Sequence, residues 1–307
     1  MLRGTRSERG LGKPDHEPNG ARQTDTQAVY DRRRRFFRAG ETSEEGDRRA
    51  LEDRLRRASG PLLQSAGMRI AVLSDIHANL HALDAVLAVA GDVDAVWHLG
   101  DVVGYGPDPD GVVDRLRDVD AKGVRGNHDA AACGGSEIDW FNPEARRAME
   151  WTRAAISDAT RAWLTDLPER RTLETCELVH GSPREPLWEY VTSVPIARAN
   201  LALLKSPIGL HGHTHLPVAF VEDDGRVDVV GPRGGSELVL HERRALINPG
   251  SVGQPRDGDP EASFIVLDPE GGTVAWHRVA YDIEAVQHAM QSAGLPASLS
   301  ARLSVGL

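Results

Sequence analysis

The stretch that decides the fold is Met68 to His77, which reads Met-Arg-Ile-Ala-Val-Leu-Ser-Asp-Ile-His. Its apolar run, Ile70 to Leu73, is rich in branched residues and predicts a strand that is buried on both faces, as parallel strands are. Asp75 and His77 follow directly, so we expect both at the carboxyl end of this strand. The next apolar residues recur at helical spacing and predict a helix over residues 80–90.

Two further strands follow along the chain, and each ends in polar residues. Residues 95–99 run into Gly100-Asp101, and a strand near residues 123–124 runs into Arg125-Gly126-Asn127-His128-Asp129. A second helical pattern covers residues 108–119. The order strand, helix, strand, helix, strand predicts a parallel sheet with right-handed crossovers. Such sheets place their functional sites at the carboxyl ends of the strands, where these polar residues stand.

The second half of the chain adds two histidine blocks, each again after an apolar strand. A strand expected over residues 173–179 ends at His180. A short strand over residues 208–210 runs into Gly212-His213-Thr214-His215. Both blocks therefore belong with the polar strand ends of the first half.

Two longer regions complete the expected fold. Residues 144–167 have one long helical pattern, in which one side is shared by Trp151, Ala155, Ala159 and Trp163. Packing of this side against the core is favoured over a role as a lid or a dimer face. The last third is rich in strands, expected over residues 218–221, 226–230, 237–240, 245–247, 263–267 and 273–279, with closing helices over 282–293 and 297–303. This strand count suggests a second sheet packed on the first, in an α/β fold.

Seven side chains with metal-ligand chemistry stand at or just after these strand ends. They are Asp75, His77, Asp101, Asn127, His180, His213 and His215. A lone histidine after a strand is more often structural, but seven such ligands at one sheet edge predict a metal site. Carboxylate, imidazole and amide oxygen are the ligands that hard and borderline divalent cations prefer.

Composition narrows the class of protein. The 307 residues are 40% hydrophobic, which allows a large core, and no apolar stretch reaches the ~20 residues of a membrane helix. Two cysteines give no disulfide framework, so we expect a cytoplasmic protein without a membrane segment.

The charge is distributed unevenly along the chain. The net charge is −10; residues 1–67 hold 14 Arg, 1 Lys and 11 acidic residues, a net +4, so the remainder carries −14. An acidic body argues against general nucleic-acid binding.

Composition also divides the chain into two parts. Residues 1–67 are polar and almost free of aliphatic residues before Leu51, so we expect a disordered extension. Arg32 to Arg35 could form a basic arm, although a solvated run of charge is favoured. Residues 68–307 are expected to form one folded domain, whose oligomeric state the sequence leaves open.

The polar blocks together resemble the five-block signature of the calcineurin-like metallophosphoesterases. In chain order they are Asp75-x-His77, Gly100-Asp101, Gly126-Asn127-His128-Asp129, His180 and Gly212-His213-Thr214-His215. The stretch from Asn248 to Arg256 is also similar to one in small bacterial phosphodiesterases of this superfamily. The resemblance implies a four-layer αββα sandwich, in which two packed mixed sheets are flanked by helices.

The resemblance also implies a role for each candidate residue. One divalent metal ion would be held by Asp75, His77 and His215, the other by Asn127, His180 and His213, and Asp101 would bridge the two. Mn²⁺ is favoured, with Fe, Zn, Ni or Mg as alternatives. A hydroxide bridging the metals would attack the phosphoester directly, and His128 would be the catalytic acid.

The substrate is the least determined part of this hypothesis. In the protein-phosphatase branch an Asp and an Arg follow the Gly-Asp block, at positions held here by Gly104 and Tyr105. We therefore expect an enzyme for small phosphodiesters; the alternatives are a phosphomonoesterase or protein phosphatase, a dinucleoside polyphosphate hydrolase, and a non-catalytic scaffold of the same fold. Two arginines, Arg125 and Arg256, could contact phosphate, and four aromatic residues could stack a nucleobase, although packing is favoured for them: Tyr105, Trp140, Phe141 and Trp188.

Overall fold

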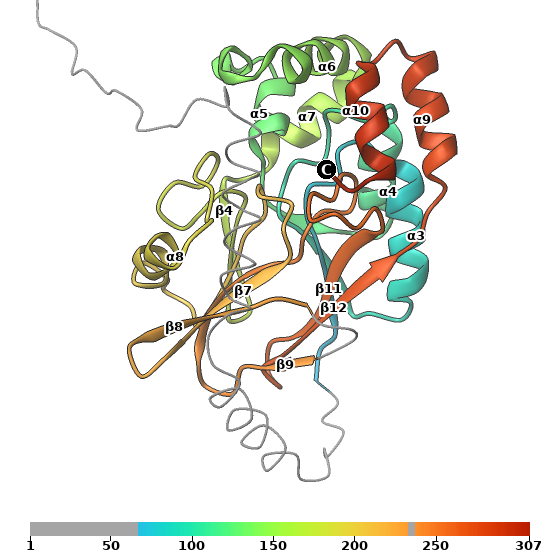
Figure 1. Ribbon diagram of the computed structural model, residues 1–307. Coiled ribbons are helices and arrows are strands. Elements are labelled where there is room, and N and C mark those ends of the chain that lie inside the picture. The colour runs from blue at the N-terminus through green and yellow to red at the C-terminus, as the bar shows by residue number, and fades with distance from the viewer. Residues whose placement is uncertain (1–66, 233–236) are drawn as a thin grey trace, which may run out of the picture.

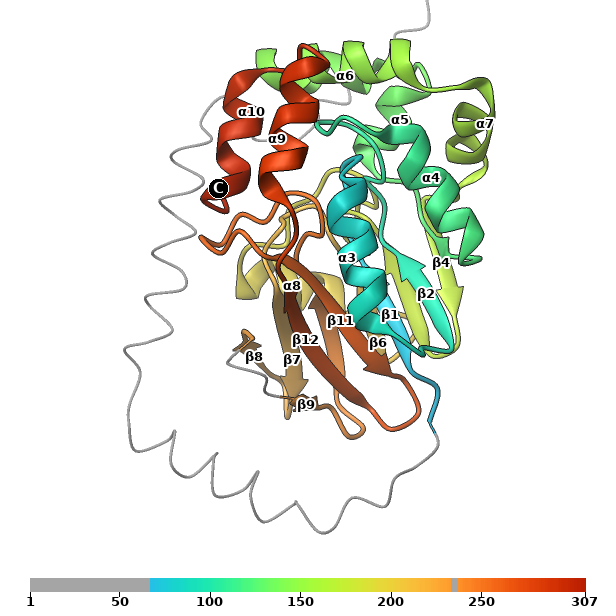
Figure 2. The same cartoon turned by 90° about the vertical axis from the view of Figure 1, so that its right-hand side faces the viewer.

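Two mixed β-sheets pack face to face, and helices cover their outer sides (Figures 1 and 2). The computed structural model describes residues 67–232 and 237–307. The predicted extension, residues 1–67, lies outside the described residues except for Gly67. In the described ranges no helix combines the length and the apolar character needed to cross a membrane.

The first sheet has the strand order β3-β2-β1-β11-β12-β9 within the described residues. Its strands are β1 (Ile70–Leu73), β2 (Ala95–His98), β3 (Lys122–Gly123), β9 (Glu237–Val239), β11 (Ala262–Asp268) and β12 (Thr273–Val279). β1 is central and pairs parallel to β2, which pairs parallel to β3, while β11 runs antiparallel to β1. The parallel order predicted for the first three strands is therefore confirmed.

The second sheet has the order β4-β5-β6-β10-β7-β8 in the same part of the chain. Its strands are β4 (Arg170–Leu173), β5 (Cys176–Val179), β6 (Ile208–Leu210), β7 (Val218–Asp223), β8 (Arg226–Val230) and β10 (Arg244–Asn248). β6 lies parallel to both of its neighbours, β5 and β10. The late strands do not all form this second sheet, because β9, β11 and β12 extend the first one.

Helices cover the outer face of each sheet. α3 (Leu80–Ala90), α4 (Pro109–Asp118), α5 (Asn127–Ala132), α6 (Pro143–Ala155), α7 (Asp158–Asp166), α9 (Ile283–Ser292) and α10 (Ala297–Ala301) lie with the first sheet, together with the 3₁₀ turns Ser136–Trp140 and Arg302–Ser304. α8 (Val194–Leu201) packs on the second sheet. The four-layer αββα architecture is thus confirmed.

The alternation of side chains along β1 explains the layers. Ala71 and Leu73 pack against the helices of the first sheet, whereas Ile70 and Val72 pack between the two sheets. All four side chains are fully buried. A strand that buries both faces needs the continuous apolar sequence on which the prediction rested.

Two predicted elements were wrong in their extent. The helical pattern over residues 144–167 is two helices, because the chain is extended at Ile156 and Ser157, and the Ser157 hydroxyl caps α7 by accepting from Thr160 N at 3.2 Å. Trp151 and Trp163 therefore belong to different helices. The strand predicted over residues 173–179 is the end of β4 and the whole of β5, which pair as a hairpin with its turn at Glu174. The first break lies at a polar capping residue, Ser157, and the second at a residue with positive φ, Glu174.

Candidate metal centre

The predicted ligands follow strands of both sheets. They meet where the carboxyl ends of these strands face each other. The first sheet contributes Asp75 and His77 after β1, Asp101 after β2, and Asn127 at the start of α5. The second contributes His180 after β5 and two residues after β6, His213 and His215. All seven side chains are buried, none more than 3% exposed.

Left-handed backbone conformations turn these side chains into one centre. Positive φ angles between 50° and 64° occur at Asp75, His77, Asp101, His213 and His215. Such angles are uncommon for residues other than glycine and cost free energy, so they persist where the surrounding structure imposes them. The positive φ angles recur at i and i+2 in both pairs, Asp75 with His77 and His213 with His215, and turn these side chains toward the centre.

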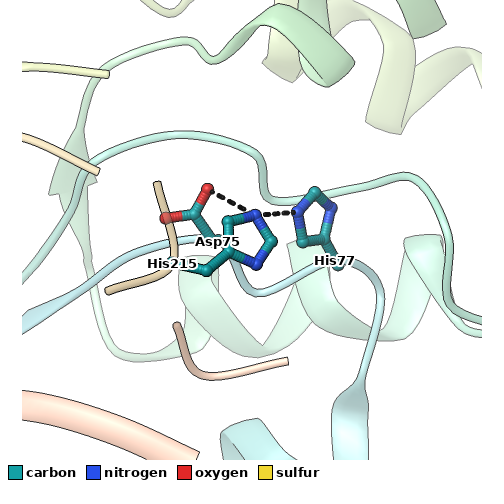
Figure 3. Close-up of side chains that lie close together, drawn as sticks. All are labelled: Asp75, His77 and His215. Atoms are coloured by element: carbon teal, nitrogen blue, oxygen red, sulfur yellow. Dashed lines mark hydrogen bonds and ion pairs between the residues drawn. The ribbon is translucent and has the colours of Figure 1, made fainter. Parts of the chain in front are cut away.

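The first group of potential ligands is Asp75, His77 and His215 (Figure 3). His215 Nε2 lies 3.3 Å from Asp75 Oδ1 and 3.2 Å from His77 Nε2. Two ligand atoms that bind one ion at right angles, each at ~2.1 Å, lie about 3 Å apart. The distances therefore match atoms that share a cation.

The protonation of the two imidazoles strengthens this interpretation. His77 Nδ1 lies 3.3 Å from the Val103 carbonyl oxygen, and His215 Nδ1 lies 2.6 Å from the Gln254 carbonyl oxygen, so each Nδ1 carries the hydrogen and donates it. Burial lowers the pKa of both imidazoles well below the usual value, so both rings are neutral. Their Nε2 lone pairs then face each other across 3.2 Å, which is unfavourable without a positive charge between them.

The second group is Asp101, His180 and His213, with Asn127 beside it. His180 Nε2 lies 3.3 Å from Asp101 Oδ2, 3.0 Å from Asn127 Oδ1 and 3.1 Å from His213 Nδ1. Burial works against charge here, but the neighbouring Asp101 carboxylate outweighs it and raises the pKa of His180 to about 9. Asp101, although buried, has its pKa held well below the usual range by His180. This group too is built around a positive charge.

Asp101 connects the two groups. Its Oδ2 atom lies 3.3 Å from His180 Nε2 and 3.8 Å from His77 Nε2, so one oxygen faces both. Its Oδ1 atom accepts a hydrogen bond from the His128 backbone at 2.9 Å, which fixes the carboxylate. The residues present therefore fit divalent cations, with Asp101 next to both groups.

His128 lies next to these ligands and forms a third group with His77 and Asp101, whose potential ligand atoms lie within 4.8 Å of one another. Its ring centroid is 4.8 Å from that of His77 and 4.4 Å from that of Tyr105. Its Nδ1 is buried and has no hydrogen-bond partner in the described residues. A Cβ added at Gly104 would lie only 2.5 Å from this atom. Gly104 thus stands where the phosphatase branch has an acidic residue, and the close approach of His128 leaves no room for an acidic side chain there. Burial lowers the pKa of His128 to about 4.

The two candidate phosphate-binding arginines have different surroundings. Arg125 Nη2 forms an ion pair with Glu169 at 3.2 Å, so its charge is already compensated. Arg256 has no carboxylate within 4.0 Å among the described residues, and its guanidinium lies 5.9 Å from the Tyr105 ring centroid. Burial lowers the pKa values of three ligand histidines, and the positive charge of Arg256 lowers them further, so Arg256 lies beside the metal centre.

The four aromatic candidates lie close to the centre and to one another. Phe141 stacks on His128 at 4.6 Å, Trp188 lies 5.0 Å from Trp140, and Trp140 is 54% exposed. Sequence reasoning missed a fifth ring, Tyr190, which stacks on His213 at a centroid distance of 3.9 Å.

Sequence reasoning also missed the supporting role of the loop after β10. The buried Asn248 side chain donates to the Gly212 carbonyl at 2.7 Å and to the Thr214 hydroxyl at 3.1 Å, which holds the histidine block in place. The Gln254 carbonyl orients His215. The resemblance over Asn248 to Arg256 was a signal for this loop, but it did not indicate which atoms make the contacts.

Comparisons with known proteins agree with this geometry. A sequence profile described as the calcineurin-like phosphoesterase superfamily domain matches residues 68–272, about two thirds of the chain. The chain belongs to the calcineurin-like phosphoesterase superfamily. It is therefore a metal-dependent phosphoric ester hydrolase, and the expected family, fold and enzyme class are confirmed.

Relatives within this superfamily cover most of the folded region. A crystal structure of a metallophosphoesterase from Sphaerobacter thermophilus is 44% identical, with a TM-score of 0.73, over 78% of this chain and all of that one. The uncharacterised protein MJ0912 of Methanocaldococcus jannaschii is 33% identical over 77% of this chain and 98% of its own length. The phosphodiesterase YfcE of Escherichia coli is 32% identical over 66% of this chain and 88% of its own.

Proposed function

We propose that this calcineurin-like phosphoesterase is a dinuclear-metal enzyme that hydrolyses small phosphodiesters. The observation that carries the proposal is the position of Asp101, whose Oδ2 atom faces His77 of one ligand group and His180 of the other. Similarity to the phosphodiesterase YfcE supports a diester as substrate. Mn²⁺ is the metal we favour for a site of mixed carboxylate and imidazole ligands.

The residues of the chain would divide the work. Asp75, His77 and His215 would hold one divalent cation, and Asn127, His180 and His213 the other, with Asp101 shared. Two cations bound there would lower the pKa of a water between them toward about 7 and would neutralise charge on the phosphoryl group. His128, one ring away from His77, would stabilise the leaving oxygen by hydrogen bonding.

The sharpest test is the replacement Asp101→Asn. An amide bridges two cations less well than a carboxylate, so we expect both metals to bind more weakly and turnover to fall by at least 10²-fold. Elemental analysis of the Mn²⁺-loaded wild type should give about two ions per chain. Asp223→Asn, a change on an exposed strand end, is the matched control and should alter neither quantity. One ion per fully active chain would refute the dinuclear proposal.

A further inference from the structure

Two arginines converge at the edge of the metal centre, and neither forms a close ion pair in the described residues. Arg256 Nη2 donates to the Gln254 side-chain oxygen at 2.9 Å, and Arg302 Nη1 reaches the same oxygen at 3.4 Å. Neither arginine has an acidic group within 4.0 Å in the described parts of the chain, and both side chains are half-buried. Like charges held around one neutral atom repel each other, so the arrangement needs a further reason.

The arrangement is tied directly to the ligand set. Gln254 is 2% exposed, and its backbone carbonyl accepts from His215 Nδ1 while its side-chain oxygen holds the arginines. The Arg256 guanidinium also lies over the Tyr105 ring, which contacts His77 at a centroid distance of 4.7 Å. The two positive charges are therefore positioned by residues that touch the metal ligands.

Arg302 comes from a part of the chain that the family profile does not cover. The match ends at residue 272, whereas Arg302 begins the 3₁₀ turn after α10. The C-terminal end docks on the loop after β10 through a hydrogen bond from Gly258 N to the Gly306 carbonyl at 2.9 Å. This docking brings Arg302 to Arg256, so the C-terminal segment adds a charge to the site that the family's motifs do not supply.

The two arginines have different electrostatic surroundings, although both are half-buried. Arg256 acts electrostatically on Asp75, His77 and His213, whereas the groups that act on Arg302 are Arg256, Tyr105 and Glu144. Burial and the Arg256 charge together lower the pKa of Arg302. Arg256 is thus the member of the pair whose charge acts on the candidate ligands.

We infer that Arg256 and Arg302 form a subsite for a second phosphate group of the substrate. Guanidinium groups present a planar fork that matches phosphate oxygens, and two of them balance the charge of a phosphate monoester, about −1.5 to −2 at pH 7. An anion between the arginines also removes their mutual repulsion. The inference rests on the proposed function, because the group cleaved at the metals is taken to be a diester and the second phosphate a spectator.

Two substrates with one leaving group test the subsite. The 5′-(p-nitrophenyl phosphate) ester of thymidine is compared with the same ester bearing a 3′-phosphate, using the Mn²⁺-loaded full chain. We expect the 3′-phosphate to raise kcat/KM by about tenfold or more, mainly through KM. In Arg302→Gln the ratio of the two kcat/KM values should fall to near one, and Arg302→Lys should retain part of it. The control Arg226→Gln, an exposed arginine of β8, should keep the wild-type ratio.

A ratio near one in the wild type, or an unchanged ratio in Arg302→Gln, would overturn the inference. Sulfate binding provides a readout that does not depend on turnover. Relative to sodium chloride of equal ionic strength, sulfate should raise the unfolding temperature of the wild type and of Arg226→Gln more than that of Arg302→Gln. If neither ester is cleaved, the proposed function fails, and the sulfate result alone decides the subsite: equal shifts in all three proteins would refute it.

Discussion

At the scale of single residues, the His128 imidazole is held beside the candidate ligands by the packing of neighbouring rings. Its ring touches Tyr105 and stacks on Phe141, while its backbone N–H donates to Asp101. The Asp101 contact comes from the main chain, so it does not depend on the imidazole. The side chain is therefore free to act on the substrate while its backbone supports the ligand.

This separation predicts the behaviour of His128→Ala. We expect the variant to fold and to bind two metal ions as the wild type does, because neither proposed ligand set includes His128 and the backbone hydrogen bond to Asp101 remains. Turnover of a diester should fall by about 10² to 10⁴, the usual contribution of such a group, with little change in KM. Elemental analysis and steady-state kinetics on the same preparation separate the two effects. Loss of metal comparable with that in Asp101→Asn would instead make His128 a ligand.

The sequence predicts ligand residues better than the contacts that support them. Asp75 and His77 are recognisable because a strand, a spacing of two and a ligand chemistry coincide. The role of Gln254 was not predictable, since its backbone carbonyl carries no sequence signal. Arg302 was missed for another reason: it reaches the centre only through the docking of the C-terminal end, which no local pattern reveals.

At the scale of elements, β2 ends in a buried histidine that the site does not use. The His98 side chain is fully buried, stacks on Trp163 of α7 at 5.6 Å, and has no hydrogen-bond partner for either ring nitrogen in the described residues. Burial, assisted by the Arg171 charge, lowers the pKa of His98 to about 3. This histidine is neutral in the folded protein and becomes charged on unfolding below the usual histidine pKa.

The depressed pKa of His98 predicts an acid-sensitive fold. Because the unfolded state binds the proton more tightly, the contribution is favourable above pH 6.5 and is lost progressively as the pH falls toward 3. Between pH 7 and pH 5 the free energy of unfolding should fall by on the order of 2 kcal/mol more in the wild type than in His98→Leu. Denaturant unfolding at several pH values measures this difference. The exposed His81, changed to Leu, is the control and should keep the wild-type slope.

The elements themselves show where sequence patterns succeed. α3, β6 and β12 were predicted closely, because each has a clear period or a clear boundary residue. The break between α6 and α7 was missed because apolar spacing continues across Ser157. The assignment of β11 and β12 to the first sheet was also beyond the sequence, since pairing partners far apart in the chain leave no local signal.

At the scale of the whole molecule, the folded region is organised around β1. This strand pairs with β2 on one side and with β11 on the other, and Asp75 and His77 follow its carboxyl end. All of these partners lie after residue 67. We therefore propose that residues 68–307 form one independent domain, as the composition predicts.

A chain that begins at Met68 tests this proposal. We expect it to have the unfolding temperature, metal content and kcat/KM of the full chain, because the described pairings of β1 are all retained. Differential scanning calorimetry and a diester assay on both proteins are sufficient. Aggregation or a lower unfolding temperature of the shorter chain alone would assign a structural role to the N-terminal residues.

The charge of the molecule leads to the last prediction, the preference between diester and monoester. The 240 residues from 68 onward carry a net −14, and the two proposed cations would offset this only locally. A monoester brings a dianionic phosphoryl group to the cleavage site, where Tyr105 stands in place of the phosphatase arginine and Arg125 is paired with Glu169. A diester brings one charge fewer.

The leaving group adds to this difference. An oxygen that leaves from a diester gains from stabilisation by His128, which lies beside the ligands. We therefore expect bis(p-nitrophenyl) phosphate to be hydrolysed with a kcat/KM at least about tenfold above that of p-nitrophenyl phosphate, at saturating Mn²⁺ and with the same leaving group in both. Glu169→Gln frees Arg125 and should narrow the gap if missing positive charge is its cause. A clear preference for the monoester would exclude the diester assignment and leave the metal-binding prediction intact.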